Sequence, residues 1–303
     1  MGSNQYRLRP KADVLVREAD LMAQAAATAL GTSERRRCGE VWGTRCRTWV
    51  QPPDYSHDNH GLRGSLERLA ENPNCPTWAQ QRLVQSPQGE VRVSLASNPN
   101  CAPELLTQLA QDQIPAVQKT VATNPSAPPD AMRILARSPN PDVRLSAVSV
   151  GTACPPDVVA LLAQDKRYNV RRLAARHPNC PPEAFEHLLR DRRVEVITAV
   201  AHNPNASRAQ LAAVLRNNPK ARSAVAGHPN ADPRWLAKWA EELSWTDGSY
   251  MMCGLANNPA TPPETLALLL SKTPPDVHKI IFANPNCPEE YRSLAQVASI
   301  AVG

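Results

Sequence analysis

The stretch that decides the fold runs from Val91 to Asp112 and reads VRVSLASNPNCAPELLTQLAQD. Edited copies of it recur along most of the chain, and we call the first residue of its Asn-Pro-Asn core the anchor. The anchors are Asn72, Asn98, Asn124, a degenerate copy at Gly151, His177, Asn203, His228, Asn258 and Asn284. They are 26, 26, 27, 26, 26, 25, 30 and 26 residues apart. Self-similarity at a period of this size is typical of a solenoid of stacked units.

Each copy is expected to contain two short helices. The segment before the anchor, such as Val91–Ala96, has its apolar residues at helical spacing. Proline at the next position ends that helix, because it lacks an N–H group and restricts the residue before it. A second helix then begins at Pro-Pro-acid sequences such as Pro181-Pro182-Glu183. Proline suits the first helical position, and an acid in the first turn meets the positive end of the helix dipole.

A helix of two or three turns cannot bury its apolar face alone, so each repeat must rely on its neighbours for a core. The residue two positions before the anchor supports close stacking, because it is almost always alanine. These alanines are Ala70, Ala96, Ala122, Ala175, Ala201, Ala226 and Ala256. We therefore predict an all-α solenoid of about nine repeats with no β-sheet.

The repeated pattern V-R-x-x-x-A-x-N-P-N-x-P-x-x-x-L-x-x-L-A-x-D resembles the leucine-rich repeat variant family over about residues 61–303. The resemblance implies a right-handed superhelix in which each repeat pairs an α-helix with a short 3₁₀-like helix. A HEAT-like array is the alternative fold, since Asp142-Val143-Arg144 also fits that motif. The variant repeat is preferred because 26 residues are too few for two full HEAT helices.

One branch of the resembling family carries a four-iron, four-sulfur cluster before its repeats, and an accessory protein of that kind is one functional alternative. Such a cluster needs four thiolates. The corresponding region of this chain offers only Cys38 and Cys46. With His57 and His60 these cysteines have the ligand types of a zinc site, although the C-x7-C and H-x2-H spacings match no established pattern. No cofactor is assigned.

The chain is expected to have two parts. Residues 1–60 hold an amphipathic helix over Ala12–Leu30 that would cap the array, followed by a basic segment with cysteine and tryptophan. Residues 61–303 form the repeats. No signal peptide, myristoylation motif or membrane-spanning run is recognised, so we expect a cytoplasmic protein.

Five cysteines occupy one slot of the repeat, three residues after the anchor: Cys75, Cys101, Cys154, Cys180 and Cys287. Equivalent residues of stacked repeats lie roughly 8–10 Å apart, whereas a disulfide needs α-carbons within about 7 Å. These cysteines are therefore expected to be reduced and buried as small apolar residues.

His177 and His228 replace asparagine at the anchor. An imidazole can bond the same backbone groups as an amide, so we expect a structural role for both, as for the anchor asparagines that bond backbone at the turn. The chain shows no glycine-rich phosphate loop, nucleophile elbow or convincing acid pair. We therefore predict that it is not an enzyme.

Positive charge is concentrated in one part of the chain. Residues 160–240 contain 14 Lys and Arg against 6 Asp and Glu, a net charge of +8, while the whole chain has +6. Stacking could align the arginines of the first helices as a ladder that contacts a partner. The candidates are Arg92, Arg144, Arg171, Arg172 and Arg222.

Three interpretations of this ladder remain open. It could bind an acidic protein, bind nucleic acid through its phosphates, or simply keep the surface soluble. Aromatic residues that would stack on bases are scarce in the basic region. We favour a repeat scaffold that presents an extended, partly basic surface to another protein. The partner and the oligomeric state are not specified by the sequence.

Overall fold

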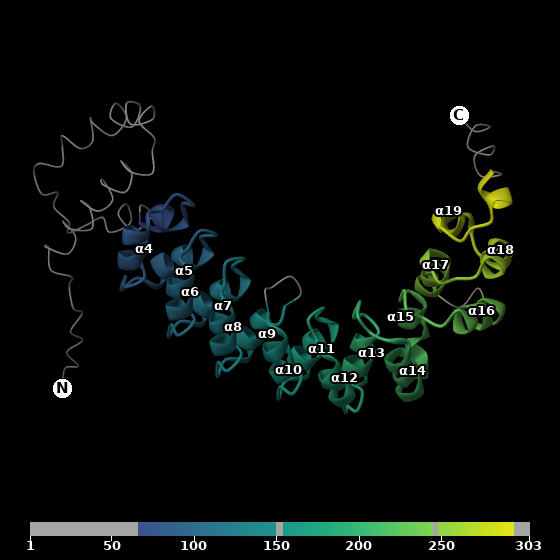
Figure 1. Cartoon of the computed structure of the whole chain (residues 1–303), viewed down its shortest axis with the longest axis horizontal. Helices are drawn as coiled ribbons and strands as arrows, with labels where there is room; N and C mark the ends of the chain where they lie inside the picture. The colour runs from purple at the N-terminus through teal and green to yellow at the C-terminus, as the bar shows by residue number, and fades with distance from the viewer. Residues whose placement is uncertain (1–65, 150–153, 245–247, 294–303) are drawn as a thin grey trace, which may run out of the picture. The chain divides into compact units, whose positions relative to one another are not determined.

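A computed structural model describes residues 66–149, 154–244 and 248–293 of the chain (Figure 1). The chain divides into two compact units, Met1–Ala147 and Val148–Gly303, and each is described by itself. All regular structure within the described residues is helical, and none of them forms a strand. The predicted all-α class is confirmed. The predicted boundary at residue 60 and the helix at Ala12–Leu30 lie outside the described residues.

Unit 1 contains two rows of short helices (Figure 1). The first row, which we define as the helices that precede an anchor, includes α5 (Gly89–Ser97), α7 (Pro115–Thr123) and α9 (Pro141–Ala147). The second row, which follows the anchors, consists of α4 (Thr77–Leu83), α6 (Pro103–Leu109) and α8 (Pro129–Leu135). Contacts run along the rows, from α5 to α7 to α9 and from α6 to α8. This stacking is the predicted solenoid.

Unit 2 repeats the arrangement. Its first row consists of α11 (Tyr168–Arg176), α13 (Val194–Val200), the 3₁₀ helix η2 (Pro219–Ala221) continued by α15 (Arg222–Ala226), α17 (Ser249–Asn257) and α19 (Pro275–Ala283). Its second row consists of α10 (Pro156–Leu162), α12 (Pro182–Leu188), α14 (Arg208–Asn217), α16 (Pro233–Glu241) and α18 (Pro263–Lys272). Contacts join α11 to α13, α15 to α17 and α17 to α19 along the first row.

The helix type differs from what the resemblance implied. Instead of a 3₁₀-like helix in every repeat, both rows are α-helical, and η2 is the single 3₁₀ helix in the described segments of the repeat region. The reason is length, because nine residues suffice to close α-type bonds such as Gln118 N to Ile114 O. Tighter bonding is confined to the ends, where the anchor amide of Asn124 donates to Val121 O.

The second-row helices start as predicted. In α12 the first proline of the pair, Pro181, is the N-cap, and Pro182 is the first helical residue. Glu183 follows in the first turn, as Asp157 does in α10. The acid therefore lies at the positive end of each short helix.

The core of each unit is a line of side chains between the two rows. In unit 1 its largest fully buried members are Leu95, Leu106, Leu109, Met132 and Leu135. In unit 2 they are Leu162, Leu188, Leu211, Leu236, Leu255, Leu266 and Leu269. Every alanine two positions before an anchor is also buried.

The anchor asparagines from Asn98 onward bond to the preceding repeat, and we call this series of bonds the anchor ladder. Asn124 donates through Nδ2 to Ala96 O at 2.7 Å and to Asn98 O at 2.8 Å, while its Oδ1 accepts from Ser126 N at 2.8 Å. Asn98, Asn203, Asn258 and Asn284 make the same three bonds. The first acceptor is always the alanine two before the previous anchor. A small residue is needed there because the next repeat's amide must reach its carbonyl.

Candidate functional site

Two arginines of the predicted ladder are held inside the fold by aspartates of the following turn. In unit 2, Arg171 donates through Nε and Nη2 to the carboxylate of Asp191 at 2.6 and 3.0 Å, and through Nη1 to Asp165 O at 2.7 Å. The two side chains are 16% and 4% exposed. In unit 1, Arg92 makes the same pair with Asp112 at 2.5 and 3.1 Å. We call this arrangement the arginine clasp.

The clasp sets the charge state of both partners. The hydrogen bond to Asp191 raises the pKa of Arg171, and its guanidinium is charged at all relevant pH values. Burial by itself raises the pKa of Asp191, but hydrogen bonds from Arg171 and from the Arg193 amide, with the positive charge of Arg171, bring it below its ordinary value. Removing one partner would leave a poorly solvated charge. Arg92 and Arg171 therefore join successive repeats and expose little of their charge.

Other residues in the same slot are also engaged. Gln118 donates to Asp112 O at 2.8 Å and accepts from Ser138 Oγ at 3.0 Å, which reproduces the clasp without charge. Arg144 donates to Ser138 O at 2.9 Å. Arg222 pairs with Glu242 at 3.0 Å, but both side chains are about half exposed. Residues in this slot therefore bond one repeat to the next.

Arg172 differs from the other four candidates. It follows Arg171 on α11, and successive residues of an α-helix point about 100° apart. Arg172 thus leaves the clasp and lines a hollow on the first-row face with Arg176, Val194, Glu195 and His202. Its Nε is covered and donates to no acceptor in the part of the chain that the structure describes.

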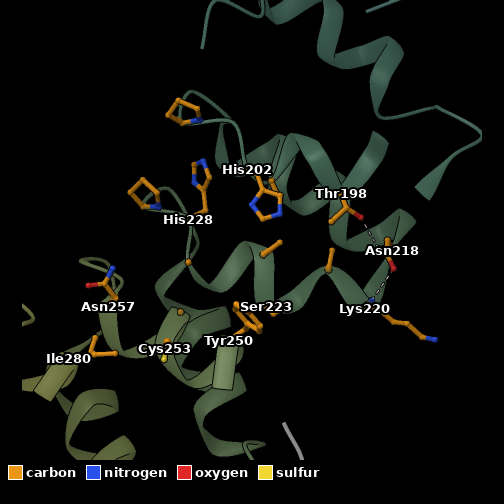
Figure 2. A pocket seen from close by; sticks show the side chains of 17 residues that line it. Thr198, His202, Asn218, Lys220, Ser223, His228, Tyr250, Cys253, Asn257 and Ile280 are labelled. Carbon is orange, nitrogen blue, oxygen red and sulfur yellow. Dashed lines mark hydrogen bonds between the residues drawn. The ribbon is translucent and has the colours of Figure 1, made fainter. Parts of the chain in front are cut away.

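A larger hollow adjoins this one and shares Thr198 and His202 with it. It has a volume of about 750 Å³ and opens on the first-row face from the end of α13 to α19. Figure 2 shows His202 and Thr198 on one side and Ser223, Tyr250 and Cys253 on the other. We call the two hollows together the first-row groove. The larger hollow is open to solvent, and its volume falls within the range of known binding sites.

The groove exists because the residues at its floor are small. Ala201, Ala221, Ala224, Gly227 and Gly254 line the larger hollow. Gly254 also allows α17 to approach α15 closely, because a Cβ added there would lie 3.2 Å from Gly227 N and 3.4 Å from Ala226 Cβ. Larger side chains at these positions would fill the space.

The rim of the groove carries more positive than negative charge. Arg172 and Arg176 line the smaller hollow, and Lys220 lies at the edge of the larger one with its side chain extending outward (Figure 2). None of the three forms an ion pair with another described residue. Glu195 is the single carboxylate among the lining residues. Partial burial, followed by the charge of Arg176, lowers the pKa of His202.

His228 also lines the larger hollow, but its ring belongs to the anchor ladder. Its Nδ1 accepts from Asn230 N at 3.0 Å, and its Nε2 lies 2.7 Å from Asn203 O. These contacts require the neutral ring with the proton on Nε2. Both ring nitrogens therefore bond to backbone groups, which agrees with the structural role predicted for His228. At the other anchor histidine, His177 Nδ1 accepts from Asn179 N at 3.1 Å.

The five cysteines in one slot are buried and free, as predicted. Burial raises the pKa of Cys180 to about 12 and that of Cys75 to about 11, so these thiols stay protonated and unreactive. Cys253 lies in a different slot, lines the groove and is partly exposed. The candidate metal ligands Cys38, Cys46, His57 and His60 lie outside the described residues. Within residues 66–149, 154–244 and 248–293, no group of three or more potential ligands could hold a metal ion.

Sequence reasoning missed the groove and Arg176. The signal that could have found them is the position four before the anchor, which is Ala199, Ala224 and Gly254 in three successive repeats. Small residues in a row on one face leave a hollow. The lengthened 30-residue interval also contributes to the groove, because Tyr250 in α17 is 86% exposed and lines it.

No helix in the described portion of the chain has the length and apolar character needed to cross a membrane. A search among curated proteins found no match. Among solved structures, the chain is similar to one described as a leucine-rich repeat variant with a novel repetitive protein structural motif. The two share 21% identity over 72% of this chain and 84% of that chain, with a TM-score of 0.46.

The sequence profile of the leucine rich repeat variant family matches residues 168–193, which contain α11, the anchor His177, α12 and the Arg171–Asp191 clasp. The predicted resemblance to the leucine-rich repeat variant family is therefore confirmed at this repeat.

Proposed function

We propose that the chain is a non-enzymatic repeat scaffold that binds another protein through the first-row groove of unit 2. The observation that carries the proposal is the hollow of about 750 Å³ with a floor of alanine and glycine and a rim of polar and cationic side chains. Pockets that combine apolar walls with a few convergent polar groups are the usual form of a recognition site.

The rigidity of the scaffold supports this role. Anchor bonds and clasps fix neighbouring repeats to one another, as Asn203 and the Arg171–Asp191 pair do next to the groove. A binding surface that is ordered before the partner arrives loses less conformational entropy on binding. Each repeat then contributes a few side chains to one face.

The same contacts favour a protein over nucleic acid. Arg92 and Arg171 are neutralised by aspartates within the fold, so they contribute little to phosphate binding. Tyr250 is the single Phe, Tyr or Trp side chain among the residues that line the groove, which provides a poor platform for stacked bases. A merely solvated arginine surface would not require the small-residue floor.

The proposal assigns no catalytic residue. The imidazole of His228, which would be the obvious base in the larger hollow, has both nitrogens engaged with the backbone of Asn203 and Asn230. We place the protein in the cytoplasm, because its buried thiols suit a reducing compartment. Cofactor binding is not part of the proposed function.

The test is a pair of tryptophan substitutions with cross-linking in the native extract. Ser223→Trp places a large side chain in the groove, and Ser271→Trp places the same side chain on exposed α18 in the second row. Partner peptides cross-linked to groove residues in the wild type should be lost in Ser223→Trp and kept in Ser271→Trp. Equal losses in both variants, or cross-links confined to the second row, would refute the proposal.

A further inference from the structure

Arg172 and Arg176, which line the smaller hollow, have hydrogen-bonding capacity that the described part of the fold does not use. Arg172 Nε is covered and has no acceptor, although polar groups in such positions normally have a partner. Arg176, one helical turn further along α11, is exposed and forms no ion pair with another described residue. This differs from Arg171 on the same helix, whose three guanidinium nitrogens each donate a hydrogen bond.

We infer that the first-row groove binds an acidic peptide segment, with a carboxylate at Arg172 and Arg176 and a proton taken up on His202. The inference rests on the proposed function and names the chemistry of the partner. Planar guanidinium groups match the geometry of a carboxylate and bond it with two donors. The larger hollow, which shares His202 and Thr198 with the smaller one, would hold the residues that flank this carboxylate.

The charges around the groove indicate which sign of charge its occupant carries. The charged and titratable groups that face His202 or line the two hollows are Arg172, Arg176, Glu195, Lys220, His228, Tyr250 and Cys253. Glu195 is the only member of this set that is negative at neutral pH, against three permanent cations. An extended segment that carries Asp or Glu therefore gains attraction along the groove, whereas a basic segment would be repelled.

His202 links this binding to pH. In the free protein its pKa is lowered by partial burial and by the charge of Arg176, so the ring is neutral at pH 7.5. A carboxylate beside it neutralises Arg176 and favours the protonated ring, which raises the pKa of His202 in the complex. Affinity must then increase as the pH falls through the bound-state value, and it levels off below the free-state value.

The experiment uses the full chain and a fluorescein-labelled octaglutamate peptide in an anisotropy titration at pH 7.5 and pH 5.5. The wild type should bind at both values and about tenfold more tightly at pH 5.5, which requires the pKa of His202 to rise by at least about one unit for the one proton taken up. A labelled octaglutamine peptide should not bind. Circular dichroism at each pH controls for loss of the fold.

Two variants with the same change of net charge separate the groove from general basicity. Arg172→Gln with Arg176→Gln should weaken binding by at least tenfold. Arg190→Gln with Arg216→Gln removes two exposed arginines from the second-row side and should leave the affinity within twofold. His202→Gln should abolish the difference in affinity between pH 7.5 and pH 5.5, whatever its affinity at pH 7.5. If His202 acted only on the stability of the fold, replacing it would not remove the pH dependence of peptide binding.

The possible failures are distinguishable. If octaglutamate does not bind while Ser223→Trp still removes the cross-linked partner, the acidic occupant is wrong and the proposed function stands. If a labelled twelve-nucleotide oligouridylate binds more tightly than octaglutamate and loses affinity in the Arg172 and Arg176 variant, the occupant is nucleic acid and the inference is overturned. Equal weakening in both double variants would also overturn it.

Discussion

Replacing one anchor asparagine should locally open the array, and Asn124→Ala is the clearest case. The side chain is 5% exposed and makes three hydrogen bonds, to Ala96 O at 2.7 Å, to Asn98 O at 2.8 Å and from Ser126 N at 2.8 Å. A typical intramolecular hydrogen bond contributes about 1 kcal/mol net, so the three bonds together contribute about 3 kcal/mol. This corresponds to a more than hundredfold increase in the population of the locally open state.

The assay is amide hydrogen exchange on the full chain, because a repeat array need not unfold in a single step. Peptides that cover α5 to α7 should lose protection in Asn124→Ala, while peptides from unit 2 provide an internal reference. Asn100→Ala is the matched control, since its side chain donates one exposed bond to Pro73 O at 2.9 Å and should cost only about 0.5 kcal/mol.

Asn124→His adds a graded test. Histidine is a natural anchor at His228, where it makes two of the three bonds that asparagine makes. The substitution should therefore destabilise by about 1 kcal/mol, between the control and the alanine variant. If Asn124→Ala and Asn100→Ala reduced protection to the same extent, the anchor ladder would not be what holds successive repeats together.

Three further predictions concern unit 2. Asp191→Asn should destabilise the chain, and the difference in stability from the wild type should be largest at neutral pH and shrink in acid. The reason is that a carboxylate with a lowered pKa contributes its stability above the ordinary pKa of Asp and loses it as the pH falls through the folded-state pKa. Urea midpoints at pH 7 and pH 3.5 measure this difference, and a difference that does not change with pH would contradict the clasp. Cys180 should resist iodoacetamide at pH 8 in the folded chain, because burial raises its pKa to about 12, whereas the partly exposed Cys253 should be alkylated first; mass spectrometry of the peptides decides the order. His228→Asn should leave the urea midpoint unchanged or raise it, since asparagine can restore the second ladder bond, and a clear loss would mean that the imidazole is required there.

Much of the scaffold could be predicted from the sequence because its determinants are local. Proline positions set the helix starts, and Pro181 and Pro182 lie at the N-cap and first helical positions as expected. The alanines two before the anchors and the five cysteines were correctly predicted as buried, because small residues repeated in one slot indicate close packing. The prediction of a 3₁₀-like helix in each repeat was wrong, because it was taken from the family resemblance and not from the length of the helical segments.

The bonds between repeats were harder to predict, because they depend on which residues of neighbouring repeats come into contact. Asparagine at a turn was expected to bond backbone, but only stacking shows that Asn98 bonds the carbonyls of Ala70 and Asn72 in the repeat before it. The arginines were read as a surface, although an acid lies 20 residues after Arg92, Arg171 and Arg222 in each case. That spacing was visible in the sequence and would have indicated the pairs with Asp112, Asp191 and Glu242.

The interval between His228 and Asn258 is four residues longer than the usual 26, yet Asn258 still bonds Ala226 O at 2.6 Å and His228 O at 2.8 Å. The extra residues are thus absorbed outside the points where neighbouring repeats are joined. Insertions and deletions in this chain can therefore accumulate between joints without changing the joints themselves. A protein built in this way can acquire a new loop in one repeat, and the adjoining repeats need no compensating substitution.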